Sequence, residues 1–121
     1  MHYAILCYDS EAVVAGWSKE RDDAVMAKNL AVKAELSAQG KMGPTLRLMP
    51  TTTATTLRAG AQPVVLDGPF AETKEQLLGF YIVECDDLNE AIEIAKRFMH
   101  GSGALEIRPI MALWQDSPGP A

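Results

Sequence analysis

The sequence predicts an α+β fold, a ferredoxin-like sandwich built from a split βαβ unit with an added β-hairpin. Three observations support this prediction. The 121 residues suffice for one ordinary domain, and with 48% hydrophobic residues the chain can bury a sizeable core. Two helical patterns of similar length each lie between stretches with strand character. A further pair of short strand-like stretches stands between the two halves.

The first strand is expected over residues 2–8, where both alternating faces are apolar, as in a central strand that is covered on both sides. Asp9 ends this strand, and residues 12–17 are expected to form a loose apolar connection. Cys7 and Cys85 both fall in predicted strands. Neither has a Cys or His at metal-ligand spacing, so we expect two reduced core cysteines and no metal site.

The first helix is expected to begin after Ser18, whose side chain can cap it, and to end at Gly40, where glycine permits a left-handed backbone. Small apolar residues recur at spacings of three and four residues. These residues predict the face that packs on the sheet: Leu30, Ala31, Ala34 and Ala38.

Two short strands are expected next, an irregular one within residues 41–50 and a threonine-rich one over residues 51–58. The latter forms a hairpin with residues 63–66. A fifth strand over residues 79–85 leads into the second helix, where Asp87 and Glu90 form a capping-box-like start.

We expect the second helix to end at His100 and Gly101, and we interpret His100 as a C-terminal residue that the helix dipole favours when protonated. The last strand covers residues 105–111. We expect residues 1–114 to form a single domain and residues 115–121 to form a flexible tail.

The charge balance argues against two classes of partner. Eleven Lys and Arg residues stand against 16 Asp and Glu residues, giving a net charge of -5, which suits neither a nucleic-acid backbone nor an anionic membrane. The N-terminus has no basic region and resembles a first strand more than a signal peptide. We therefore expect a cytoplasmic protein that binds no nucleic acid and no membrane.

The stretch from Asp67 to Gln76 is the candidate functional loop, because ionisable residues on a loop between two strands often carry function. Asp67 is the candidate catalytic residue, as a general base in a cavity. The alternative is that its carboxylate caps the following Gly-Pro-Phe turn by accepting backbone N–H bonds. We expect Phe70 to be a plug that fixes this loop.

Four further residues are candidates for binding substrate, each with a structural alternative. Glu72 could act as a second carboxylate beside Asp67, or cap a short helical turn over residues 73–77. Lys74 could bind an anionic group, or form a salt bridge with its acidic neighbours. Arg108 could reach an anion in the cavity, or pair with Glu106 on its own strand. Tyr81 could offer its hydroxyl to the cavity, or be a half-buried core residue.

The predicted layout places both helices on one face of the sheet and leaves the other face open. One alternating set of residues 80–85 would then form a broad apolar patch on a lone chain, which is typical of an interface. We therefore expect a homodimer in which two open faces pair around a two-fold axis.

Residues 67–77, which contain the Asp-Gly-Pro-Phe motif, and residues 79–81 resemble the signature of the DGPF-domain proteins in the YCII-related superfamily. The match runs over residues 51–111, whereas the first third matches only in pattern. Flanking stretches that also resemble the family are residues 54–58, 87–91 and 106–109.

The resemblance implies a ferredoxin-like α+β fold that pairs as a dimeric α–β barrel. It also implies a role in one of two settings, since some members of the superfamily are dehydrochlorinases or related aromatic-degradation enzymes and others are encoded beside extracytoplasmic-type sigma factors. The superfamily carries a proposed His/Asp pair with its histidine on the first helix. This sequence has no histidine between Ser18 and Gly40, and its histidines are His2 and His100.

The sequence therefore supports two function classes. The first is a small cofactor-free enzyme that acts by acid–base chemistry on a small anionic or aromatic molecule in the dimer cavity. The second is a ligand-binding or regulatory interaction module without catalysis, linked to a sigma-factor stress response.

Overall fold

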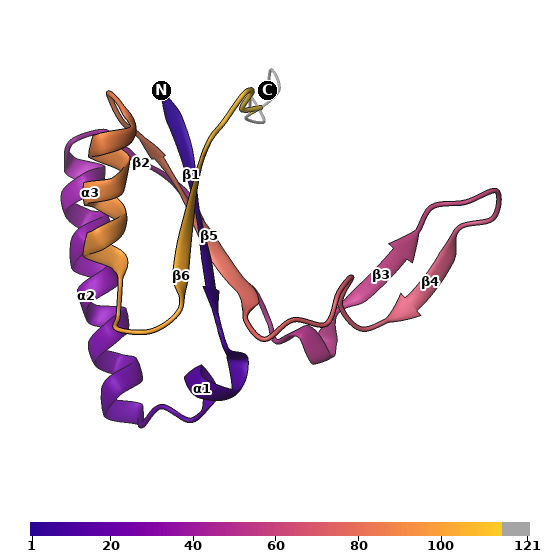
Figure 1. The fold of residues 1–121 in the computed structure, drawn as a ribbon. Coiled ribbons are helices and arrows are strands. Elements are labelled where there is room, and N and C mark those ends of the chain that lie inside the picture. Colours follow the sequence, from indigo (N-terminus) through magenta and orange to yellow (C-terminus); the bar gives the residue numbers. More distant parts are fainter. Residues whose placement is uncertain (115–121) are drawn as a thin grey trace, which may run out of the picture.

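The computed structural model describes residues 1–114 and contains a four-stranded antiparallel sheet in the order β2–β5–β1–β6. A separate two-stranded antiparallel sheet pairs β3 with β4 (Figure 1). The strands are β1 (His2–Asp9), β2 (Met42–Arg47), β3 (Thr55–Arg58), β4 (Val64–Asp67), β5 (Gln76–Glu84) and β6 (Ala104–Pro109). The tail predicted over residues 115–121 lies outside the described residues.

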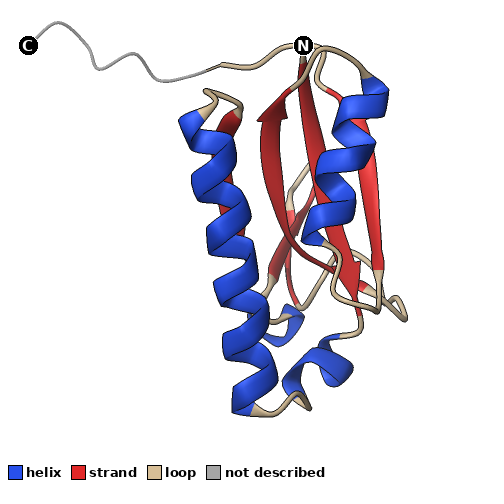
Figure 2. Ribbon diagram, turned by 90° about the vertical axis from the view of Figure 1, so that its left-hand side faces the viewer, coloured by secondary structure: helices blue, strands red, loops and turns tan. Residues whose placement is uncertain are grey.

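The two long helices cover one face of the large sheet, as Figure 2 shows. The helices are α1 (Glu11–Ala15), α2 (Lys19–Ala38) and α3 (Leu88–Phe98). The strands and long helices follow the order β-α-β-β-α-β, with the β3–β4 hairpin inserted between the second and third strands of the large sheet. This arrangement confirms the predicted α+β class with helices on one side.

Both predicted helix starts and the predicted end of the first helix are confirmed by their caps. The end predicted for the second helix at His100 and Gly101 is wrong, because α3 ends at Phe98 and Met99 already has an extended backbone. The Ser18 side chain accepts a hydrogen bond from the backbone N–H of Arg21, and the Asp87 side chain accepts one from Glu90. Gly40 follows α2 with φ of 70°, which is the left-handed conformation expected of a residue just past a helix end. Hydrogen bonds of this type stabilise each helix by about 1 kcal/mol.

The core lies between the sheet and the helices. Its largest fully buried side chains are Ile5, Leu36, Val83 and Phe98. In β1 and β6, Tyr3, Ile5, Leu105 and Ile107 face the helices and belong to this core or pack against it. The prediction that β1 is covered on both sides is wrong for a single chain, because the helices lie on one side of the sheet (Figure 1).

The predicted packing face of the first helix is wrong. Leu30 is 60% exposed, and Ala31, Ala34 and Ala38 are also exposed. The residues of α2 that are buried against the sheet are Asn29, Val32 and Leu36. The prediction failed because the buried face of α2 includes the polar residue Asn29, whereas the prediction followed apolar side chains alone.

Two connections also differ from the sequence prediction. The stretch expected to be a loose connection begins with α1, which Ser10 caps by accepting from the N–H of Val13. The threonine-rich strand starts later than predicted, since residues Thr51–Thr53 form a 3-10 turn before β3. Pro50 precedes that turn and lacks the N–H that a strand would require.

The β3–β4 hairpin, here called the arm, projects from the body on the side away from the helices (Figure 1). The sheet face on that side is covered by no described element (Figure 1). Within residues 1–114, no helix has both the length and the apolar character needed to cross a membrane.

Candidate functional site

A cavity of about 310 Å³ lies between α2 and the sheet, near the end of β1. This volume is at the lower end of the range typical of small-molecule sites. The side chains that line it include Cys7, Trp17, Asn29, Lys33, Tyr81 and His100, with an apolar wall from Val25, Met26, Leu46, Phe80 and Phe98.

The cavity exists because the two long helices have different lengths. The 20 residues of α2 extend for about 30 Å, whereas the 11 residues of α3 extend for about 16 Å. The first half of α2 therefore extends beyond the end of α3 (Figure 2). Gly79 on β5 also lines the cavity, and a side chain at this position would collide with the backbone oxygen of Leu46.

His100 lines this cavity and lies close to Asp9, which does not itself line it. The Nε2 atom of His100 lies 3.9 Å from Oδ2 of Asp9, and Asp9 is only 3% exposed. The Asp9 carboxylate is fixed by two further hydrogen bonds of 2.7 Å, from the backbone N–H of Ser10 and the hydroxyl of Ser102. A carboxylate anchored in this way can orient an imidazole ring beside it.

The other nitrogen of His100 has no partner. Its Nδ1 atom is buried and makes no hydrogen bond with any residue that the structure describes. An N–H on Nε2 would point at the Asp9 carboxylate, and this tautomer of the neutral ring leaves the Nδ1 lone pair free as a base. A buried polar atom without a partner costs about 1–3 kcal/mol, and a bound donor would remove that cost.

The loop that carries His100 is held from α2. Trp17 packs edge-on against the His100 ring, with 4.9 Å between ring centroids. The Arg21 guanidinium lies over Trp17 and donates a hydrogen bond of 3.0 Å to the backbone oxygen of His100. Lys28 donates to the backbone oxygen of Met99. These contacts explain why His100 turns back over the cavity where α3 has ended.

The opposite side of the cavity contains a tyrosine and a cysteine, both uncharged at neutral pH. Burial raises the pKa of Tyr81 to about 12, with a further contribution from Cys7. Burial likewise raises the pKa of the Cys7 thiol to about 11, against a lowering effect of the Lys33 cation. Tyr81 is therefore a hydrogen-bond donor, and Cys7 is a neutral thiol and a poor nucleophile.

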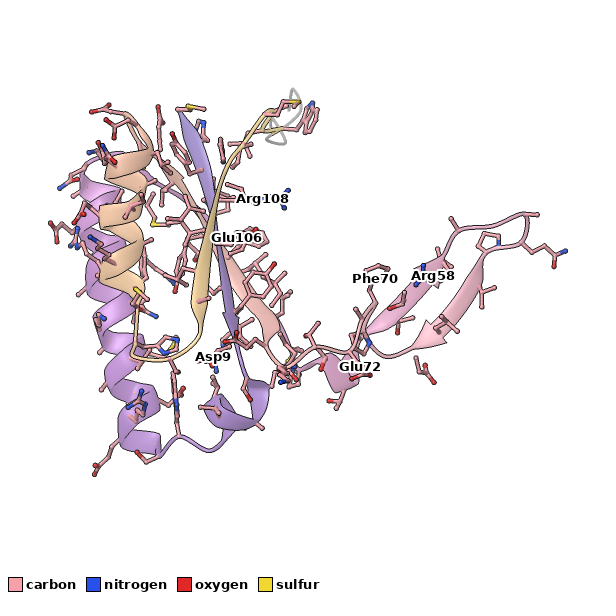
Figure 3. The ribbon with its side chains drawn as sticks, in the orientation of Figure 1. Asp9, Arg58, Phe70, Glu72, Glu106 and Arg108 are labelled. Atoms are coloured by element: carbon pink, nitrogen blue, oxygen red, sulfur yellow. The ribbon has the colours of Figure 1, made fainter. Side chains whose placement is uncertain are left out.

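Of the five residues selected from the sequence, Tyr81 lines this cavity and the others do not. Asp67, Glu72 and Lys74 are exposed on or beside the arm. Figure 3 shows Glu72 and Phe70 there, well separated from Asp9 on the body. The structure thus leaves the catalytic role of Asp67 as a prediction and places it outside the cavity of its own chain.

Around Asp67, the turn is fixed by the backbone and a threonine. The N–H of Gly68 donates to Ala54, and the hydroxyl of Thr56 donates to Gly68, each at 2.8 Å. Gly68 has φ of 100°, a conformation that favours glycine. No described residue donates a hydrogen bond to the Asp67 carboxylate, so the predicted cap of the Gly-Pro-Phe turn by Asp67 is wrong, and these contacts account for Gly68.

The remaining loop interpretations change. Phe70 is 73% exposed, with the Arg58 guanidinium over its ring, so it does not plug the loop of a single chain. Residues 73–77 form bends and the start of β5 and no helical turn. Lys74 makes no salt bridge with any described residue.

Arg108 and Glu106 are exposed on the uncovered side of β6 (Figure 3). Their side chains are not within salt-bridge distance in the part of the chain that the structure describes. Arg108 therefore faces away from the helix side, where the cavity lies. Among residues 1–114, no three His, Cys, Asp or Glu side chains are grouped as a metal site would require.

Sequence reasoning missed the pair at the cavity, although one signal was present. Asp9 continues the alternation of Tyr3, Ile5 and Cys7, so it points to the helix-covered side and is buried. A buried aspartate at a strand end requires partners, and this requirement marks a candidate site. No pattern in the sequence brings His100 to it, because the two residues come from opposite ends of the chain.

Two comparisons with known proteins agree on the relationship. The model of the YCII-related domain matches residues 1–114. An uncharacterised protein of Rhizobium meliloti (strain 1021) is 49% identical over 114 residues, which cover 91% of this chain and 92% of that protein. The match includes the first third of the chain, where the sequence motifs alone carried no resemblance.

Proposed function

We propose that this chain, which belongs to the YCII-related domain family, is a small cofactor-free acid–base enzyme whose active site is the cavity beside His100. His100 accepts or donates a proton through Nδ1, and Asp9 orients the ring. The observation that carries this proposal is the contact between His100, which lines the cavity, and the buried, doubly hydrogen-bonded Asp9. The pair belongs to the chemistry of proton transfer and needs no activated nucleophile.

The separation of 3.9 Å between His100 and Asp9 is longer than a hydrogen bond. Catalytic contacts of this kind commonly shorten when substrate is bound. The edge-on Trp17 ring and the hydrogen bond from Arg21 limit the ring to small movements. A movement of about 1 Å would bring Nε2 within hydrogen-bond distance of the carboxylate.

Deuterium exchange tests this function without a known substrate. Small hydroxy acids, keto acids and phenols are incubated with the protein in deuterated water, and incorporation at carbon is followed by proton NMR. We expect the His100→Gln variant to lose about 10²- to 10⁴-fold in rate for any compound that exchanges. His2→Gln is the matched control, because His2 contacts Glu84 at a distant strand end and should exchange at the wild-type rate.

The result also decides between the two function classes. Exchange that is equally fast in the His100→Gln variant would refute the proposal. Compounds that bind in the cavity but never exchange would favour the alternative, a non-catalytic ligand-binding or regulatory module.

We further propose that two copies pair through the uncovered sheet face and the arm, as in a dimeric α–β barrel. The arm supports this, since a two-stranded hairpin alone is marginally stable in water and this one exposes apolar side chains on both faces. Leu57 and Val65 lie opposite each other in the ladder and are each 67% exposed. The further exposed apolar residues of the arm are Val64, Leu66 and Phe70.

Sedimentation equilibrium tests the dimer. We expect Leu57→Glu to raise the dimer dissociation constant at least about tenfold, because a charge would replace a buried apolar contact. Leu30→Glu is the control, since Leu30 is equally exposed on the outer side of α2. A wild-type chain that remains monomeric at micromolar concentration would contradict this assembly.

The two cysteines are free in the structure, and this supports the proposal of a reducing, cytoplasmic setting.

A further inference from the structure

Three side chains form a polar cluster at the side of the cavity opposite His100. Asn29 and Lys33 are one turn apart on α2 and both line the cavity. Tyr81 lies across from them on β5, where Asn29 Nδ2 donates to its hydroxyl oxygen at 3.4 Å and Lys33 Nζ lies 5.5 Å from its ring centre. These residues are here called the polar cluster.

Lys33 is a half-buried cation without a carboxylate partner. Within residues 1–114 it forms no salt bridge, although the chain has a net charge of -5 and an excess of acidic residues. Arg47, the neighbouring cation at the cavity, differs in this respect because it lies 3.9 Å from Asp22. A cation that is kept partly desolvated and unpaired beside a cavity is a site for an anion.

Asn29 adds an unsatisfied acceptor. Its side chain is about nine-tenths buried, and its Oδ1 atom has no hydrogen-bond partner among the described residues. Because its Nδ2 already donates to Tyr81, the Tyr81 hydroxyl hydrogen is free to donate elsewhere. The cluster therefore offers one cation, one hydroxyl donor and one acceptor.

We propose that the polar cluster binds a small carboxylate that also bears a hydroxyl group, and so sets the substrate class of the proposed enzyme. Lys33 pairs with the carboxylate, the Tyr81 hydroxyl donates to it, and Asn29 Oδ1 accepts a hydrogen bond from the ligand hydroxyl. This inference rests on the proposed function for the identity of the site. It goes further by naming the chemistry that the site recognises.

The surroundings select a carboxylate with an apolar body over a phosphate. A phosphate site in a protein typically uses a helix N-terminus or a nest of backbone N–H groups. The N-terminus of α2 lies about 15 Å along the helix from Asn29. The rest of the cavity wall is apolar and aromatic, and Phe98 stacks on Tyr81 with 4.1 Å between ring centroids.

Calorimetric titration with three matched probes tests this assignment. The probes are 3-hydroxybenzoate, benzoate, which lacks the hydroxyl, and phenol, which lacks the carboxylate. We expect the wild-type protein to bind 3-hydroxybenzoate about three- to tenfold more tightly than benzoate, the effect of one hydrogen bond, and to bind phenol most weakly.

The variants separate the two recognition elements. Lys33→Met should weaken 3-hydroxybenzoate and benzoate equally, by at least about tenfold, and leave phenol unchanged. Asn29→Leu should abolish the preference for 3-hydroxybenzoate over benzoate. Tyr81→Phe keeps the ring stacked on Phe98 and should weaken both carboxylates, so the test survives if Asn29→Leu does not fold. Lys19→Met is the control, since Lys19 pairs with Asp23 on the exposed start of the same helix.

Two results would overturn the assignment. One is equal binding of the three probes, or no binding, by the wild-type protein. The other is wild-type affinity for both carboxylates in Lys33→Met. These titrations record binding alone. The expected binding pattern can therefore be found even if His100→Gln keeps its deuterium exchange, and the two tests distinguish an incorrect ligand class from an incorrect catalytic residue.

Discussion

Replacing Gly103 with alanine should distort the carboxylate that holds His100. Gly103 precedes β6 with φ of 75°, a left-handed conformation that is costly for any residue with a side chain. A Cβ atom at this position would lie 2.2 Å from the backbone oxygen of Tyr8 and 2.9 Å from the carboxylate carbon of Asp9. The substitution therefore adds a collision with β1 to the backbone strain.

The magnitude follows from these two terms. The left-handed backbone costs an alanine about 1–2 kcal/mol. Gly40→Ala isolates this term, because Gly40 has φ of 70° and no atom lies within 4 Å of its added Cβ. At Gly103 the Tyr8 carbonyl must also retreat by about 1.2 Å to restore an ordinary contact, and overpacking of this kind costs about 1–3 kcal/mol. We therefore expect about 2–5 kcal/mol for Gly103→Ala.

Urea unfolding of the two variants measures the difference directly, with the free energy of unfolding extrapolated to water. The folded fraction of Gly103→Ala should also lose most of the deuterium exchange that depends on His100, because its Asp9 is displaced, whereas Gly40→Ala should exchange at the wild-type rate. Equal loss of stability and equal exchange in the two variants would show that Gly103 does not lie close to Asp9 and does not help to hold Asp9 beside His100.

Three further predictions concern the core, an ion pair and the cavity thiol. Phe98→Ala should lose about 3–5 kcal/mol in urea unfolding, because Phe98 is fully buried and stacked on Tyr81. A hydrogen bond from Lys41 holds the pKa of Glu90 below its usual value. The wild type should therefore melt at a higher temperature than Glu90→Gln at pH 7, and this difference should disappear as the pH falls through the folded pKa of Glu90. A difference in melting temperature that persists at pH 2 would contradict the pairing. Because burial raises the pKa of Cys7 to about 11, iodoacetamide should alkylate it slowly in the native protein at pH 8 and much faster as the pH approaches 11, which mass spectrometry of the labelled peptide would show.

The fold was predictable because local patterns agreed with it. The helix caps Ser18 and Asp87, the glycine after α2 and the alternation of β1 depend on neighbours along the chain, which a sequence displays. The packing face of α2 was not predictable in the same way. It carries Asn29 and Lys33 toward a cavity, so the apolar period that marks a core-facing helix is interrupted where the candidate site lies.

The candidate site was not predictable for a related reason. Its parts come from both ends of the sequence, and each has a sufficient local explanation, Asp9 as a strand end and His100 as a helix end. Only the folded structure shows that Asp9 is buried, accepts hydrogen bonds from Ser10 and Ser102, and lies close to His100. The Asp-Gly-Pro-Phe motif, by contrast, is contiguous and recognisable, and its backbone contacts with Ala54 and Thr56 give it a structural role that needs no chemistry.

Asp67→Asn separates these two roles of the motif. Asp67 lies opposite Thr55 in the arm and does not line the cavity of its own chain, so we expect the deuterium exchange that depends on His100 to stay within about twofold of the wild-type rate. The base of the arm nevertheless contacts a residue close to the site. The carboxylate of Glu11, which lies two residues after Asp9 in the chain, accepts hydrogen bonds from the N–H and hydroxyl of Thr51. A large loss of exchange with an unchanged dimer would therefore mean that Asp67 of a second copy completes the cavity, which would restore it as the catalytic residue. A loss of dimer with exchange retained would instead assign the motif to assembly.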